Sequence, residues 1–195
     1  MTIRVATTDD VDAIVDTLTS AFFHDPLWGP VFPDEAQRAR QAAAMWRLYA
    51  VDGLRHHWLL VTEHVEAAAV WTAPGTDELT EENAAALPAL LAEVAGQSVS
   101  DEIMDLFHRF EGVRPTEPHC YLSLLGTHDR HRGQGIGMQL LRDSLDRVDD
   151  LGMPAYLESS NPANNRRYES VGFAELGGFT APSGHRVTTM WRPAS

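Results

Sequence analysis

The sequence predicts a single α/β domain, in which helices flank a mixed central sheet of about six to seven strands. Short apolar runs that are typical of strands alternate with stretches whose apolar residues recur every three or four positions, as in helices. The chain has 195 residues, of which 44% are hydrophobic, and this suits one sizeable core better than two. A glycine-rich loop between a strand-like and a helix-like segment adds a connection that α/β folds use.

The first 75 residues contain strand, helix and hairpin patterns. Asp9 or Asp10 is the expected cap of the first helix. The segment from Phe22 to Pro30 ends that helix, because its prolines and glycine interrupt helical hydrogen bonds. The expected elements are a strand over residues 3–6, helices over 11–22 and 36–49, and the two strands of a hairpin over 58–62 and 65–71.

Residues 77–115 are predicted to form a helical insertion, and they have the weakest pattern in the chain. Helical periodicity extends to Phe110, with breaks expected at Pro88 and at Gly96-Gln97-Ser98. The pattern leaves open whether this insertion covers a substrate site or forms a homodimer contact.

The C-terminal part alternates strands with helices. A helix is expected to begin near Gly135, directly after the glycine-rich loop, and Gly152-Met153-Pro154 ends it. A second, shorter helix is expected over residues 162–171. The expected strands lie over residues 119–125, 155–158, 173–176 and 186–191.

Bulk properties exclude several classes of protein. The formal net charge is −13, and phosphate contacts need a basic face, so nucleic acid is not an expected partner. No run approaches the roughly 18 to 20 apolar residues of a membrane-spanning helix, and the first residues lack the pattern of a signal peptide. The single cysteine, Cys120, rules out an internal disulfide and favours a cytoplasmic location. The acidic charge favours the approach of a cationic substrate such as an amine.

The loop Arg132-Gly133-Gln134-Gly135-Ile136-Gly137 has the features of an anion site. The first turn of a helix leaves backbone N–H groups unpaired, and the macrodipole adds about half a positive charge there. Glycines let phosphate oxygens approach these amides, and Arg132 adds a cation with forked donors. The spacing fits neither the G-x-G-x-x-G fingerprint nor a Walker loop, which needs a lysine. A turn that only permits close strand-to-helix packing is the alternative.

A second motif lies downstream and ends in Tyr168-Glu169-Ser170-Val171-Gly172-Phe173. Together with the R-x-x-G-x-G loop, it resembles the GNAT acetyltransferase superfamily. Members carry such a loop after their fourth strand and an Asn-containing helix ending in Y-x-x-x-G-F after their fifth. The likeness is clear over residues 119–175. Asp25-Pro26 and residues 67–75 resemble a bacterial branch that includes puromycin N-acetyltransferase.

The resemblance implies a sheet that splays between its fourth and fifth strands and holds acetyl-CoA, a co-substrate, in the opening. The pantetheine arm would pair with the strand backbone, as an added strand does, and loop amides would bind the pyrophosphate. Two asparagines would contact the pantetheine or phosphate region, although both also suit helix caps. The implied cofactor-binding residues are Leu125, Gly126, Thr127, Arg132, Gly133, Gln134, Gly135, Ile136, Gly137, Asn161, Asn164 and Tyr168.

The resemblance also implies that Tyr168 is the general acid, which protonates or hydrogen-bonds the departing thiolate. A general base must accept the proton of an alkylammonium, whose pKa is about 10.4. Glu158 leads among the candidates for this base, and His119, Asp25 and His24 are the others. No metal is expected, because the histidine pairs lack the further ligands of a closed site. Cys120 is not expected to carry the acyl group, since no His or Asp partner supports a thiolate.

The function implied by this resemblance is N-acetyl transfer from acetyl-CoA by direct attack of a primary amine of a small molecule. A protein or peptide N-acetyltransferase is the first alternative. A non-catalytic module that senses acyl-CoA is the second. The matching residues all belong to the cofactor side, so they leave the acceptor open.

Overall fold

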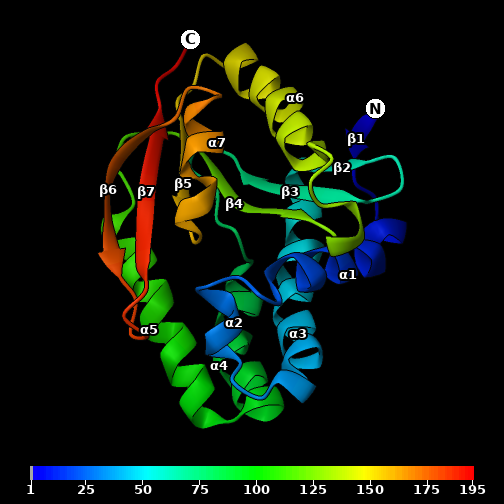
Figure 1. The fold of residues 1–195 in the computed structure, drawn as a ribbon, viewed down its shortest axis with the longest axis vertical. Coiled ribbons are helices and arrows are strands. Elements are labelled where there is room, and N and C mark those ends of the chain that lie inside the picture. The colour runs from blue at the N-terminus through cyan, green and yellow to red at the C-terminus, as the bar shows by residue number, and fades with distance from the viewer. Residues whose placement is uncertain (1) are drawn as a thin grey trace.

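One mixed sheet forms the centre of the molecule, with the strand order β1-β2-β3-β4-β5-β7-β6 over residues 2–195, which the computed structural model describes (Figure 1). All neighbouring strands are antiparallel except β4 and β5, which are parallel. The sheet of these described residues consists of β1 (Ile3–Val5), β2 (Leu59–Thr62), β3 (Ala67–Thr72), β4 (Cys120–Thr127), β5 (Ala155–Ser159), β6 (Ala174–Thr180) and β7 (Arg186–Arg192).

Helices cover both faces of this sheet. Helix α6 connects the parallel strands β4 and β5, as a parallel pair requires. In Figure 1, α6 lies at one end of the molecule, while α4 and α5 lie at the opposite end. The helices are α1 (Val11–Phe22), α2 (Trp28–Val31), α3 (Glu35–Gly53), α4 (Glu81–Ala95), α5 (Gln97–Val113), α6 (Ile136–Asp150) and α7 (Asn165–Glu169).

The two faces of the sheet pack into two separate hydrophobic clusters. In the larger cluster, the five helices α1 through α5 pack against the sheet at residues that include Val61, Val70 and Leu124. The smaller cluster packs α6 against the other face, at Leu122 and Leu157 among others. Helix α6 has the pattern for this, because its buried leucines and valine recur at three- and four-residue steps while its other face is charged.

The predicted α/β fold is confirmed, and most predicted elements are present with shifted ends. The predicted break at Gly96 is confirmed: this residue has a φ of +93° and separates α4 from α5. The predicted break at Pro88 is wrong, because α4 continues through this residue. A proline inside a helix costs about 3 kcal/mol, and burial of the flanking Leu87 and Leu91 offsets this cost. The segment expected only to end the first helix contains the short helix α2.

Candidate functional site

Strands β4 and β5 pair along only three residues and then separate. The paired residues are Cys120 to Leu122 with Ala155 to Leu157. Beyond Leu122, β4 pairs only with β3, so one edge of its second half has no strand partner in the described chain. An open strand edge presents unpaired backbone N–H and C=O groups, and it is therefore able to accept an extended ligand.

A β-bulge lies where the two strands separate. The register between β3 and β4 shifts because Val70 faces Leu124 while Trp71 faces Leu122, which leaves Ser123 as an extra residue. The faces of the strand change accordingly: Leu122 packs in the α6 cluster, whereas Leu124 packs in the cluster of α1 to α5. The bulge also turns the Ser123 side chain into one of the two cavities described next.

Two cavities open on either side of this separation. The first, called here the glycine-loop cavity, has a volume of about 530 Å³ and is bounded by the loop from His131 to Gly137. The second, called the aromatic cavity, has a volume of about 540 Å³ and is bounded largely by α3, α4 and α5. The two cavities share four lining residues, Phe22, Leu125, Ser160 and Tyr168. They therefore meet at one junction.

The glycine loop has a backbone conformation that only glycine adopts easily. Gly133 and Gly135 have φ values of +78° and +77°, and a Cβ atom at either position would meet no protein atom within 4 Å. Gly135 caps helix α6, so the first N–H groups of this helix have no partner inside the helix. Gly137 serves packing instead, because its Cβ atom would lie 2.5 Å from Thr127 Oγ1. The free space above Gly133 and Gly135 fits the approach of a phosphate group.

Two arginines line the glycine-loop cavity. Arg132 forms an ion pair of 2.7 Å with Asp129 and donates to the carbonyl oxygen of Ala21, so it ties the loop to α1. The cation expected at Arg132 is present, but Asp129 partly neutralises its charge. Arg167, which follows the glycine-rich loop in the sequence, lines the same cavity and donates to Asn164 Oδ1 over 3.0 Å.

Eleven of the twelve residues predicted to bind the cofactor line the glycine-loop cavity, and only Gln134 does not. Gly126 carries a further constraint, since its Cβ atom would lie 3.0 Å from the Ala21 side chain of α1. Asn161 accepts a hydrogen bond from the Ala163 amide and caps the short turn before α7. The structure thus brings the predicted set together around one cavity.

Three candidate bases occupy positions that do not favour that role. Both carboxylate oxygens of Asp25 are engaged: Oδ1 accepts from the amides of Leu27 and Trp28, and Oδ2 accepts from Ser160. His24 lines the glycine-loop cavity rather than the aromatic cavity. His119 lines neither; its ring packs on Tyr156 and Trp191, and burial lowers its pKa.

Tyr168 lies at the junction of the two cavities. Its ring packs edge-on against Phe173, with 6.2 Å between the ring centroids. Burial, reinforced by the negative charge of Asp25, raises the pKa of its hydroxyl to about 12. The side chain is therefore a neutral hydrogen-bond donor at physiological pH, and it faces both cavities.

Glu158 lines the aromatic cavity from β5, the strand next to the opening. Burial raises the pKa of its carboxyl group to about 7, and Tyr121 and Arg114 oppose this shift. Its Oε1 atom is buried and has no hydrogen-bond partner among residues 2–195. A carboxyl group with a pKa near neutrality and an unpartnered oxygen is suited to accept a proton from a bound ligand.

A buried polar cluster surrounds Glu158. Arg114 forms an ion pair of 3.0 Å with Glu78 and lies 4.0 Å above the ring of Tyr121. The other oxygen of Glu78 accepts a hydrogen bond from Ser123 in the bulge. The three groups Glu78, Arg114 and Ser123 thus connect the helical insertion to the point where β4 and β5 separate.

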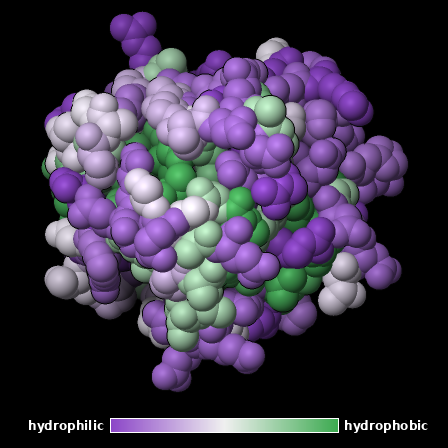
Figure 2. All heavy atoms as spheres, turned by 90° about the horizontal axis from the view of Figure 1, so that it is seen from below, coloured by the Kyte–Doolittle hydropathy of each residue, from purple (hydrophilic) through white to green (hydrophobic). Residues whose placement is uncertain are grey.

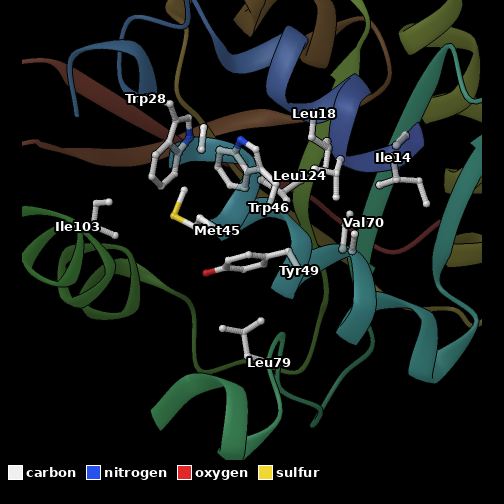
Figure 3. Close-up of a cluster of buried hydrophobic side chains, with 14 of the residues drawn as sticks. Ile14, Leu18, Trp28, Met45, Trp46, Tyr49, Val70, Leu79, Ile103 and Leu124 are labelled. Atoms are coloured by element: carbon white, nitrogen blue, oxygen red, sulfur yellow. The ribbon is translucent and has the colours of Figure 1, made fainter. Parts of the chain in front are cut away.

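Aromatic side chains form the remaining wall of the aromatic cavity. Trp28 of α2 packs edge-on against Trp46 of α3, at 5.2 Å between ring centroids, and Phe107 of α5 lies 6.1 Å from Trp28. Figure 3 shows the rings of Trp28 and Trp46 side by side, with Tyr49 below them pointing its hydroxyl away from Val70. The helical insertion, whose role the sequence left open, therefore lines one side of this cavity.

The two cavities carry opposite charge. Over residues 2–195, the aromatic cavity is lined by five carboxylates and one guanidinium, Arg114. The glycine-loop cavity is lined by Arg132 and Arg167 and by one carboxylate, Asp25. An anion is favoured on one side of the junction, and a cation on the other.

Neither metal nor thiol chemistry has a visible site in residues 2–195. No group of three His, Cys, Asp or Glu side chains comes together there to hold a metal ion. Cys120 is buried in the α6 cluster, outside both cavities, and burial raises its pKa to about 11. In the same residues, no helix has the length and apolar character needed to cross a membrane.

Comparison with known proteins identifies the family. Residues 26–173 match the model of the acetyltransferase (GNAT) family, which covers most of the chain. The chain belongs to this family. Family membership implies acetyltransferase activity with acetyl-CoA as the donor, and the glycine-loop cavity is the part of the structure that fits this donor.

Solved structures of GNAT proteins share the fold over the whole chain. A protein from Corynebacterium glutamicum described as a histone acetyltransferase and related acetyltransferase is 25% identical, with a TM-score of 0.72 and coverage of 100% of this chain and 96% of that one. Arylalkylamine N-acetyltransferase 2 from Aedes aegypti is 13% identical, with a TM-score of 0.66 and coverage of 100% and 99%. A ribosomal-protein alanine N-acetyltransferase from Escherichia coli is 17% identical, with a TM-score of 0.53 and coverage of 100% and 94%. Because proteins with such different names share this fold, the fold does not define the acceptor.

Proposed function

We propose that this GNAT protein transfers the acetyl group of acetyl-CoA to the primary amine of a small molecule by direct attack. The observation that carries the proposal is the junction at Tyr168, where a basic cavity with a phosphate-binding loop meets an acidic cavity. The anionic coenzyme would occupy the glycine-loop cavity, and the cationic amine would occupy the aromatic cavity. The reacting groups would then meet beside Tyr168 and Leu125.

Glu158 is proposed to accept the proton that the bound ammonium must lose before it attacks. A free alkylammonium with a pKa of about 10.4 is neutral in only about one molecule in a thousand at pH 7. A carboxylate with a pKa of about 7 in the same cavity offers a nearby acceptor that is about half ionised at that pH. The C–N bond then forms as the C–S bond breaks. The second proton lost by the nitrogen ends on the departing sulfur.

Tyr168 is proposed to donate a hydrogen bond to the departing sulfur. Complete transfer of its proton is unfavourable, because a pKa of about 12 exceeds that of a thiol, about 8.5, by about 3.5 units, or about 5 kcal/mol. A hydrogen bond that strengthens as negative charge develops on sulfur avoids this cost. The hydroxyl can also relay the second proton from nitrogen to sulfur without becoming an anion.

The helical insertion beside the aromatic cavity favours a small molecule over a protein or peptide. Helices α4 and α5 supply Leu87, Met104, Phe107 and Phe110 to the lining, so they narrow the space in which a peptide would need to lie. The likeness to the puromycin branch lies in strand β3 and in Asp25, which caps α2, rather than in these acceptor residues. The proposal therefore names no antibiotic acceptor.

Replacing Tyr168 by phenylalanine is expected to lower kcat by about 10²-fold while acetyl-CoA binding stays within about twofold. The ring and its packing on Phe173 remain, so only the hydroxyl is lost. Calorimetric titration with acetyl-CoA measures binding, and release of free thiol with a panel of primary amines measures turnover. Tyr49→Phe is the matched control, because it removes a hydroxyl from the aromatic cavity alone.

Two outcomes of this experiment would contradict the proposal. If the native protein did not bind acetyl-CoA, the glycine-loop cavity would not be the coenzyme site. Binding without turnover of any amine, by the native protein and Tyr168→Phe alike, would favour the non-catalytic sensor.

Substitutions in the buried polar cluster are expected to move the acidic limb of the pH profile in opposite directions. The negative charge of Glu78 raises the pKa of Glu158, and the positive charge of Arg114 lowers it. In Glu78→Gln, Glu158 ionises more readily, so the acidic limb of kcat/KM moves to lower pH. In Arg114→Gln, the acidic limb of kcat/KM moves to higher pH. Each of the two shifts is expected to be about 1 pH unit. Shifts of the same sign in both variants would show that Glu158 is not the titrating base.

A further inference from the structure

The interior of the aromatic cavity combines an aromatic wall with a carboxylate. Trp28, Trp46 and Tyr49 are nearly buried and pack on one another, while Phe107 of α5 is only partly buried. Glu158 lies on β5, the strand that pairs with β4 next to the opening, and lines the same cavity. A ligand that fills this cavity therefore meets both a carboxylate and aromatic side chains.

Charge in the cavity is arranged at two depths. Asp77, Glu81 and Glu111 are exposed and lie at the rim, where they attract a cation from solution. Inside, the charge of Glu78 is compensated by Arg114 over 3.0 Å. Glu158 is the interior carboxylate without such an ion pair among residues 2–195, and its Oε1 is unpartnered. The interior thus has a place for one positive charge rather than several.

We propose that the acceptor is an arylalkylamine, that is, an aromatic ring joined by a short alkyl chain to one primary amine. This inference rests on the proposed function, because it specifies the acceptor of the same reaction. The ring packs against Phe107 and the Trp28–Trp46 pair, and the ammonium reaches Glu158 in the same cavity. The alkyl chain crosses the apolar part of the lining, at Leu124 and Leu157.

An aromatic ring suits this wall better than an alkyl chain does. Contacts between aromatic rings add stabilisation beyond the area that they bury, and Phe107 already has tilted ring neighbours, with its centroid 6.1 Å from that of Trp28 and 6.3 Å from that of Tyr49. A polyamine fits less well, because its additional charges would have to enter an interior whose second carboxylate is already paired with Arg114. On the face of the molecule that Figure 2 shows, apolar patches lie among hydrophilic side chains.

The test compares three amines with the native protein: phenethylamine, hexylamine of similar length, and spermidine. Calorimetric titrations in the presence of coenzyme A measure binding independently of turnover, and thiol release measures kcat/KM. Phenethylamine is expected to exceed hexylamine by about 10-fold in both binding and kcat/KM. Spermidine is expected to be the weakest of the three.

Phe107→Leu is the informative variant, since it keeps an apolar side chain and removes the ring. The preference for phenethylamine over hexylamine is expected to fall to about twofold, with KM for acetyl-CoA unchanged. Leu176→Ala, at an exposed position of β6 outside both cavities, is the control and should retain the native preference. Thermal unfolding of each variant checks that the fold is kept.

Failure of this inference differs from failure of the proposed function. The arylalkylamine assignment would be overturned if turnover were highest with spermidine or hexylamine. It would also be overturned if Phe107→Leu kept the native preference for phenethylamine over hexylamine. Either result would leave the proposed acetyl transfer intact. If acetyl-CoA binds but no amine is turned over, equilibrium binding still decides: selective binding of phenethylamine supports the assignment, and equal binding of all three amines overturns it.

Discussion

Replacing Glu158 by glutamine is expected to lower kcat/KM for the amine by about 10²- to 10⁴-fold at pH 7. Glutamine keeps the shape of the side chain but cannot accept the proton of the bound ammonium. In the native protein, kcat/KM should rise with pH and level off above the pKa of Glu158, which is about 7. In the variant, activity then depends on the neutral amine in solution. It should therefore keep rising by a factor of about ten per pH unit towards the amine pKa, about 10.4.

The pH dependence distinguishes a base from a structural carboxylate. If Glu158 only supported the fold, the variant would lose activity by a constant factor at every pH, and its unfolding temperature would fall. Glu111→Gln provides the control, because it removes a carboxylate from the rim of the same cavity. The dissociation constant of acetyl-CoA should stay unchanged in both variants. A level profile above pH 7 in Glu158→Gln would contradict the assignment.

The cofactor side of the site could be predicted from sequence because its determinants are local. The loop from Arg132 to Gly137 lies in the short connection between β4 and α6 and includes the first residues of α6, and the positive φ values of Gly133 and Gly135 follow from residue type and position. Tyr168 follows within the next β–α unit. Gln134 was included by position in the motif, and only the geometry shows that it lies outside the cavity.

The acceptor side could not be predicted because it depends on tertiary contacts. Glu78, Arg114 and Glu158 come from the β3–α4 connection, the end of α5 and strand β5, and nothing in the local pattern of each relates them. The aromatic wall likewise combines α2, α3 and α5. Local pattern also failed at Pro88, where packing of Leu87 and Leu91 outweighs the helix-breaking tendency of proline.

Replacing Gly135 by valine is expected to weaken acetyl-CoA binding by about 100-fold or more. The side chain would enter the space above the first turn of α6, where no protein atom lies within 4 Å of the Cβ position. A phosphate group there would lose one or two charge-assisted hydrogen bonds to backbone amides, each contributing about 1.5–3 kcal/mol. Calorimetric titration measures the loss directly.

Backbone strain alone could also weaken this loop, because Gly135 has a φ of +77° that a β-branched residue adopts only at a cost. Gly152→Val separates the two effects. Gly152 follows the other end of α6, has a φ of +61°, and also has no neighbouring atom within 4 Å of its Cβ position. Both variants should lose similar stability, but only Gly135→Val should lose binding. Equal binding of acetyl-CoA by the two variants would show that the loop does not contact the coenzyme. The glycine-loop cavity would then not be the site of the acetyl donor.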